Sequence, residues 1–383
     1  MRESARGSTI PPAMTTKPAG ERLLSLDAFR GATIAGMILV NNSGDYANTW
    51  WPLLHQPWHG WTPTDLVFPF FLFMVGMSLV FSRRIGFRPA LWRAVKLVLL
   101  GLVANFATGG FTLPLRWAGV LQRIGLCYLA AWAAKRSLEP RGQAVLAALL
   151  LVGYWGVMKH AVGPEGFAPN LDLQTNLSAQ VDRVFLSGHL YRWTKTWDPE
   201  GVLSTLPALA TALLGLLTGE WLRSGRKAET KAAGFVVGGI LVLALAVLWG
   251  EAAPSWLLFP VNKNLWSPSF VLLTAGLAAA LFGLTWWVVD VRGVRGWTSP
   301  FVTYGKNAIA VYVGSELLAS TWNAIHWAGA DGVVRSLQER MHEILFASWL
   351  PPMLVAFAFA FANVVLWWAV ARWMDRRGIY LKV

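Results

Sequence analysis

The sequence predicts an all-α, polytopic integral membrane protein, a bundle of about ten transmembrane helices. Of its 383 residues, 55% are hydrophobic and only 14% are charged, whereas soluble domains carry about a quarter charged residues. The charged residues lie between apolar stretches long enough to cross a hydrocarbon core of about 30 Å. The net charge of +13 does not indicate nucleic acid, because most Lys and Arg residues flank these stretches.

Ten apolar runs are each long enough to form a span. They cover 28–45, 64–82, 92–108, 117–134, 143–160, 203–222, 232–250, 267–289, 300–320 and 351–373. Residues 1–21 have no apolar core, which predicts a disordered cytoplasmic N-terminus without a cleavable signal peptide. Residues 22–383 are then expected to form a single transmembrane domain.

The distribution of positive charge predicts the orientation of this domain. Every second flank between the spans is rich in Lys and Arg, and these flanks hold 23 of the 33 such residues. Because positive residues collect on the cytoplasmic side, both termini are predicted to be cytoplasmic.

Three segments are then extracytoplasmic, near 43–63, 159–202 and 321–350. The first contains no Lys or Arg. The second is too polar to span a membrane and too rich in helix breakers to be one helix, so we expect an ordered cap. In the third, apolar residues between 333 and 345 follow helical spacing, which predicts an amphipathic helix lying in the membrane interface.

The first extracytoplasmic loop carries the strongest candidate for chemistry. His55 and His59 lie in it, just before Asp65 at the start of the second span, where Thr62 or Thr64 can cap the helix. Asp65 can orient an imidazole, and a neutral imidazole so held can deprotonate an amine or carry an acyl group. The alternative is that a loop histidine only anchors the chain at the interface.

Polar groups near the spans form a second set of candidates, because such groups usually face a site or a polar partner. Asp27 and Arg30, three apart on one helix, are expected to form a structural pair. Arg123 and Lys306 lack a local acid, which favours a phosphate-bearing ligand or, equally, snorkelling or structural pairing. Candidates for binding that ligand are Arg123, Lys306, Asn307 and Arg116.

Two segments preceding spans on the outer side combine polar and aromatic groups suited to a hydroxyl-rich amine such as an amino sugar. Together with His59, the candidate substrate-binding residues are Asp198, Glu200, Asn262, Lys263, Asn264 and Trp266. The same residues would also serve as helix caps and interface anchors.

Several other classes of site are not indicated. The sequence contains no HExxH, Walker A or GxSxG motif, and its one cysteine, Cys127, excludes a disulfide framework or a thiolate metal cluster. We therefore expect no metal.

Several motifs in the same order resemble the heparan-α-glucosaminide N-acetyltransferase family in its bacterial form. The resemblance runs from residue 22 over nearly the whole chain and is carried by 22–31, 37–41, 54–71, 116–124, 198–207, 260–266 and 304–309. It implies an enzyme of the bacterial inner membrane that transfers acetyl from acetyl-CoA to a glucosamine amine. By position, the family's central histidine matches His55 and its nearby Asn matches Asn41.

The resemblance leaves two routes open for His55, which can act as an acyl carrier or as a general base. Asn41 is expected near the thioester carbonyl, and Asp65 is expected to orient the imidazole. The expected acceptor is free glucosamine or a chitin-derived or cell-wall amino sugar, and the other expected partners are the lipid bilayer and, as an open alternative, a second copy of the chain. An amino-sugar permease without acyl transfer is the alternative function.

Overall fold

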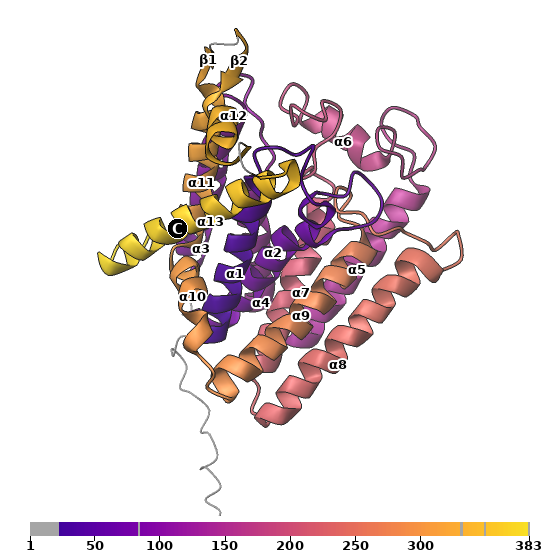
Figure 1. The fold of residues 1–383 in the computed structure, drawn as a ribbon. Helices are drawn as coiled ribbons and strands as arrows, with labels where there is room; N and C mark the ends of the chain where they lie inside the picture. Colours follow the sequence, from indigo (N-terminus) through magenta and orange to yellow (C-terminus); the bar gives the residue numbers. More distant parts are fainter. Residues whose placement is uncertain (1–22, 83–84, 330–331, 348–349, 382–383) are drawn as a thin grey trace, which may run out of the picture.

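The computed structural model describes residues 23–82, 85–329, 332–347 and 350–381, and these are mostly helical (Figure 1). The helices are α1 Leu24–Asn41, α2 Val67–Phe81, α3 Phe87–Thr108, α4 Val120–Ser137, α5 Pro140–His160, α6 Leu177–Phe185, α7 Thr205–Arg223, α8 Ala228–Val247, α9 Pro268–Trp286, α10 Ser299–Lys306, α11 Ala308–Ala324, α12 Leu337–His342 and α13 Pro352–Arg376. The strands are β1 His326–Ala328 and β2 Val334–Ser336.

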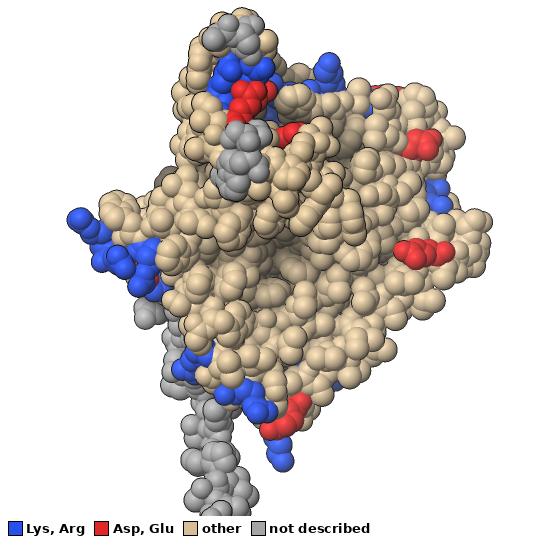
Figure 2. Space-filling model, in the orientation of Figure 1, with Lys and Arg blue, Asp and Glu red and all other residues tan. Residues whose placement is uncertain are grey.

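The predicted class, a polytopic helical membrane protein, is confirmed. Seven helical segments within the described residues are long and apolar enough to cross a membrane: Pro63–Phe81, Phe87–Thr108, Pro140–His160, Thr205–Arg223, Ala228–Ala252, Pro268–Val291 and Pro352–Arg376. The other three predicted spans also coincide with helices, namely α1, α4 and the α10–α11 pair. Figure 2 shows a broad surface band without charged side chains, with Lys, Arg, Asp and Glu toward the edges of this face.

The predicted continuous span at 300–320 is wrong, because the helix is interrupted at Asn307. This residue has φ −123° and ψ 32°, which separates α10 from α11. Its side chain is used by the chain near the C-terminus: Nδ2 donates to the Ile379 carbonyl at 3.0 Å, and Oδ1 accepts the Leu381 N–H at 3.2 Å. The Asn307 side chain at the break is therefore hydrogen-bonded to the backbone of the C-terminal segment.

The predicted amphipathic helix between 333 and 345 is only partly correct. Its first residues form β2, which pairs antiparallel with β1, His326 lying opposite Ser336. The helical part begins after Ser336 with a capping box to Glu339, and it runs from α12 directly into a π-helical segment, Glu343–Ala347. Backbone pairing in the hairpin and the helix cap together set the start of the helix at Leu337.

The bundle core depends on close helix packing at small residues. A Cβ on Gly76 of α2 would lie 1.8 Å from the Ala212 carbonyl oxygen, and one on Gly215 of α7 would lie 1.9 Å from that of Phe73. Only glycine permits this approach. The α2–α7 pair thereby provides a rigid base for the turn that precedes α2.

In α1, the expected pair of Asp27 and Arg30 is present at 3.2 Å.

The three segments predicted to be extracytoplasmic lie at the same end of the bundle, which we call the loop-rich end (Figure 1). The loop after α1 reaches the loop before α6, since Trp58 Nε1 donates to the Leu171 carbonyl at 3.0 Å. It also reaches α13, where the rings of Trp50 and Phe357 lie 5.7 Å apart. The segment 159–202 is an ordered structure built around α6.

Candidate functional site

A histidine, a carboxylate and an ammonium group meet at the loop-rich end. His55 follows the short helix Trp51–Leu53, Asp65 lies in the turn Pro63–Leu66 before α2, and Lys263 lies in the loop before α9. His55 Nδ1 is 2.7 Å from Asp65 Oδ1 and 2.8 Å from Lys263 Nζ, and Nζ is 3.2 Å from the same carboxylate oxygen. The Asp65 side chain is fully buried, whereas that of His55 is 51% exposed.

Local sequence explains how Asp65 is held. Its Oδ2 atom accepts the backbone N–H groups of Thr62 at 3.0 Å and Gln56 at 3.1 Å, which forms the expected cap at the start of the turn. The Thr62 hydroxyl donates to the Leu54 carbonyl at 2.6 Å. These contacts leave Oδ1 directed to the imidazole, so the carboxylate orientation is determined before any substrate binds.

The loop before α9 is joined to the first loop by backbone contacts. Gly60 N–H donates to the Val261 carbonyl at 2.7 Å, and Gly60 and Asn262 form an isolated parallel bridge. Asn262 Nδ2 lies 3.3 Å from His59 Nδ1, and Asn264 Nδ2 donates to the Pro57 carbonyl at 3.2 Å. His59, Asn262 and Asn264 therefore connect the two loops, and this attachment brings Lys263 to His55.

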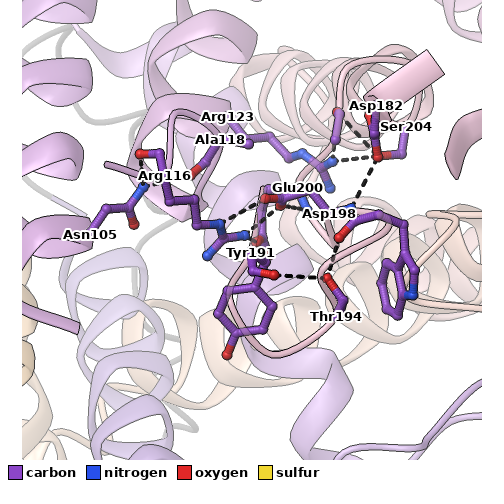
Figure 3. A network of polar contacts seen from close by, with 12 residues as sticks. Asn105, Arg116, Ala118, Arg123, Asp182, Tyr191, Thr194, Asp198, Glu200 and Ser204 are labelled. Carbon is purple, nitrogen blue, oxygen red and sulfur yellow. Dashed lines mark hydrogen bonds and ion pairs between the residues drawn. The ribbon is translucent and has the colours of Figure 1, made fainter. Parts of the chain in front are cut away.

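A second cluster of polar side chains centres on Arg116 and the loop after α6 (Figure 3). Arg116 binds both oxygens of Asp198, Nε to Oδ2 at 2.8 Å and Nη2 to Oδ1 at 2.5 Å, and Nη2 also contacts Glu200 Oε2 at 2.5 Å. Its guanidinium lies over the ring of Tyr191, 4.3 Å from the centroid. Arg116 is thus satisfied by protein carboxylates, so the reason for assigning it a phosphate ligand is removed.

Asp182 of α6 holds the loop that presents Asp198 and Glu200. Its carboxylate accepts the backbone N–H groups of Asp198 at 3.1 Å and Val202 at 2.9 Å. Burial raises the pKa of Asp182 to about 7. Sequence reasoning missed this residue, because an Asp followed by Arg183 on a short amphipathic helix looks like part of a solvated face.

Among the cations considered for a phosphate ligand, Arg123 on α4 retains unused donors. Nη2 donates to the Ser204 hydroxyl and the Gly201 carbonyl, at 2.5 and 3.2 Å, and the guanidinium lies 5.0 Å from the ring centroid of Trp266. The side chain is buried, and its Nε and Nη1 atoms find no hydrogen-bond partner within the described part of the chain. A buried donor without a partner is costly, which favours a ligand.

Trp266 has a different setting from the one its sequence position predicts. It is fully buried, and its Nε1 donates to the Thr211 hydroxyl at 3.0 Å. The ring packs against Phe68 and Phe270. It supports Arg123 from within the core, so no face of this ring is open for stacking on a sugar.

The two clusters are linked electrostatically through Glu200. Against the effect of burial, Arg116, Arg123 and Lys263 hold the pKa of Glu200 below its usual range. Loss of hydration lowers the pKa of His55, and the Lys263 ammonium lowers it further, while Asp65 and Glu200 oppose this shift. The pKa of Lys263 is lowered by burial, against Asp65 and Glu200. A neutral imidazole is therefore favoured beside two carboxylates.

The remaining candidates lie in other surroundings. Asn41, at the end of α1, donates through Nδ2 to Glu316 of α11 at 2.8 Å. Lys306, for which the sequence shows no local acid, forms an ion pair with Asp375 of α13 at 2.8 Å. The neighbouring Gly305 packs against Asp27 at the start of α1. Since Asp27 and Asn41 are about 20 Å apart along the helix, Lys306 and Asn307 are separate from the site.

The fold and the site together define a polytopic membrane protein whose loop-rich end holds a histidine oriented by a buried carboxylate. Residues 22–248 match the family model described as heparan-alpha-glucosaminide N-acetyltransferase, catalytic, and the chain belongs to this family. The matched range contains His55, Asp65 and the Arg116 cluster, whereas Lys263 lies beyond it.

Two curated relatives are similar over most of the chain. The human protein named heparan-alpha-glucosaminide N-acetyltransferase is 30% identical over 82% of this chain and 54% of its own length. The mouse protein of the same name is 28% identical over 83% of this chain and 56% of its own length. The chain thus spans about half the length of the curated relatives it matches.

Proposed function

We propose that the chain is a membrane N-acetyltransferase that transfers acetyl from acetyl-CoA to the amine of a glucosamine-type sugar at the loop-rich end. The observation that carries this proposal is the contact between His55 and Asp65. With Nδ1–H directed to the carboxylate, Nε2 keeps its lone pair and can take a proton or attack a carbonyl. The family membership supports the choice of acetyl transfer.

The reaction has two balanced routes through His55. In a ternary complex, His55 Nε2 takes a proton from the bound ammonium, and the free amine attacks the thioester carbonyl carbon. The C–S bond then breaks, and the CoA thiolate takes the second proton, which the nitrogen loses as the amide forms. In a ping-pong route, Nε2 itself attacks, CoA leaves, and the amine then displaces the acetyl group from the imidazole. Both routes yield an N-acetyl sugar and CoA.

We propose that the acceptor amine binds beside Glu200. One of its oxygens binds Arg116, and its second oxygen accepts no hydrogen bond from the described residues. An ammonium group bound there would lie between the Arg116 cluster and His55. Asp198 acts by holding Arg116, and the second N–H of the Asn41 amide is proposed to bind the thioester carbonyl.

The donor is proposed to extend toward Arg123, whose unused donors suit a phosphate oxygen. Lys306 is left out of this role because of its ion pair with Asp375. Between α1, α2, α4 and α11 lies a small apolar cavity of about 10 Å³, lined by Ile34, Phe71, Ile124 and Tyr312 among others. This is room for about one water molecule, so these helices must separate before a pantetheine arm can pass.

We propose that the chain is a bacterial inner-membrane protein, and the positive-inside distribution supports cytoplasmic termini and an extracytoplasmic loop-rich end. A cysteine introduced at Asn48 should then react with an impermeant thiol reagent added outside, and one at Gly225 only from inside. The native Cys127 is buried and gives a low background. Reversed labelling contradicts this orientation.

One observation favours the permease alternative. The helix α10–α11 is interrupted, and transporters use broken helices at substrate sites. Here the break is bound by the Ile379 and Leu381 backbone instead of facing a cavity. Liposomes containing the purified protein separate the two functions. N-acetylglucosamine formed only with acetyl-CoA supports the enzyme, and uptake of unmodified glucosamine without a donor supports the permease.

A further inference from the structure

A cavity of about 550 Å³ lies beside the Arg116 cluster, and the proposed acetyl transfer assigns it no role. One wall is the end of α3 and the loop to α4, residues 105–116, and the other is the loop after α6, residues 188–195. Its size is typical of ligand pockets, which range from about 300 to 1,000 Å³. We call it the α3–α4 pocket.

The two walls are joined by specific contacts, so the pocket is preformed. The rings of Trp117 and His189 stack at 3.8 Å with an angle of 13° between their planes. His189 Nδ1 lies 2.7 Å from the Leu115 carbonyl, and Trp117 N–H donates to the His189 carbonyl at 3.2 Å. A loop held at these points does not need to be ordered by the ligand.

The charge of the pocket favours an anion. Arg192 and Lys195 line it, no Asp or Glu does, and neither cation has an ion-pair partner among the residues that the structure describes. The Arg192 guanidinium crosses to the opposite wall, where a Cβ on Gly110 would lie 3.3 Å from Nη1. The third cation of the lining, Arg116, is already neutralised by its two carboxylates.

The rim of the pocket is apolar and exposed, which indicates a lipid as the source of the anion. Leu113 is 79% exposed and Trp193 is 70% exposed, and Phe111 and Trp117 beside them are also exposed. The candidate membrane span Phe87–Thr108 ends at the pocket. Exposed aromatic side chains at the end of a span mark the membrane interface, and basic side chains there attract the phosphate of an anionic headgroup.

We propose that the α3–α4 pocket binds the phosphate headgroup of an anionic membrane phospholipid, with Arg192 and Lys195 as its ligands and Leu113 and Trp193 against the lipid. Because Tyr191 forms part of the wall and lies under Arg116, a bound headgroup braces the loop that presents Glu200. This site is independent of the proposed acetyl transfer, since lipid binding needs neither donor nor acceptor.

The delipidated chain of 383 residues in detergent micelles tests the proposal. Native mass spectrometry would measure binding of phosphatidylglycerol, phosphatidylcholine and soluble glycerol 3-phosphate. We expect binding of phosphatidylglycerol, and an affinity lower by about tenfold to thirtyfold in the double variant Arg192→Gln/Lys195→Gln. The matched control Arg88→Gln/Arg141→Gln, which removes two exposed cations elsewhere, should stay within about twofold of wild type.

Each other outcome overturns the proposal. Equal affinity of the double variant and wild type, or equal binding of phosphatidylcholine, means that the pocket does not recognise an anionic headgroup. If glycerol 3-phosphate binds as tightly as phosphatidylglycerol, the ligand is a soluble phosphate compound instead of a lipid. In that case Leu113→Gln should leave the binding affinity unchanged. Because the readout contains no acetyl transfer, its failure is distinct from failure of the proposed function.

Discussion

His55 Nδ1 lies 2.7 Å from Asp65 Oδ1, and the ammonium nitrogen of Lys263 lies 2.8 Å from the same ring atom. One nitrogen cannot donate to the carboxylate and accept from the ammonium at once. We assign the proton to Nδ1, because Asp65 Oδ1 can then accept from both neighbours. Nε2, which lies 3.4 Å from the Lys263 ammonium nitrogen, is left as the reactive atom, and Lys263 opposes protonation of the ring.

This arrangement predicts opposite pH effects of two substitutions. Catalysis needs a neutral His55, so kcat/KM falls as the pH drops below the pKa of the imidazole. Lys263→Gln removes a neighbouring cation and raises that pKa, so the acidic limb of the pH profile should move to higher pH. Asp65→Asn removes the carboxylate that stabilises imidazolium, so the limb should move to lower pH with a loss of rate.

Profiles of kcat/KM for the three proteins measure both shifts, and Lys263→Arg, which keeps the charge, is the control for Lys263→Gln. Shifts of the two limbs in the same direction would contradict the assigned roles of Asp65 and Lys263.

A second prediction concerns the acceptor. Glu200→Gln should raise the KM for glucosamine by about tenfold or more, because a charge-assisted contact with the ammonium is lost, and should leave the KM for acetyl-CoA nearly unchanged. Glu165→Gln is the control, since Glu165 also pairs with an arginine, Arg183, at the loop-rich end. A change confined to the acetyl-CoA KM would assign Glu200 to the donor.

A third prediction separates the two cations considered for the donor. Arg123→Gln should raise the KM for acetyl-CoA by about tenfold. Ser204→Ala, which removes a hydrogen-bond partner of Arg123 but keeps its charge, should change this KM little. Lys306→Gln should leave it unchanged and reduce stability by about 1 kcal/mol or less, because the ion pair with Asp375 is partly exposed. Steady-state kinetics on folded variants checks each result.

A fourth prediction concerns pH and stability. Asp182 has a pKa of about 7 in the fold, above its usual value of 3.8. Between these values the folded state binds more protons than the unfolded state, so this group makes the free energy of unfolding fall as the pH rises toward 7. Asp182→Asn removes that contribution. Thermal unfolding measured between pH 4 and 8 should show that stability falls less steeply with rising pH in the variant than in wild type. The same slope in both proteins would contradict the raised pKa of Asp182.

Sequence reasoning succeeded where partners are close along the chain. Asp65 follows His55 by ten residues, and the helix start between them could be recognised from Thr62, so their meeting was foreseeable. Apolar length alone likewise predicted the helices, because the bilayer requires it.

Contacts between distant segments were not predictable in this way. Asp375 lies 69 residues after Lys306, and no local pattern relates them. The interruption at Asn307 depends on backbone groups of Ile379 and Leu381. Lys263 was expected to contact substrate, but its contact with His55 arises only because the loop before α9 pairs with Gly60. The burial of Trp266 depends in the same way on packing across several helices.

The central claim is that His55 carries acetyl transfer, and one comparison tests it most directly. Purified wild type, His55→Ala and the control His326→Ala, which changes an exposed histidine of β1, would be placed in lipid nanodiscs with acetyl-CoA and glucosamine, and N-acetylglucosamine would be measured by mass spectrometry. We predict that wild type and His326→Ala form the product and that His55→Ala loses at least about a hundredfold in rate. Product formation by His55→Ala at the wild-type rate would contradict the claim.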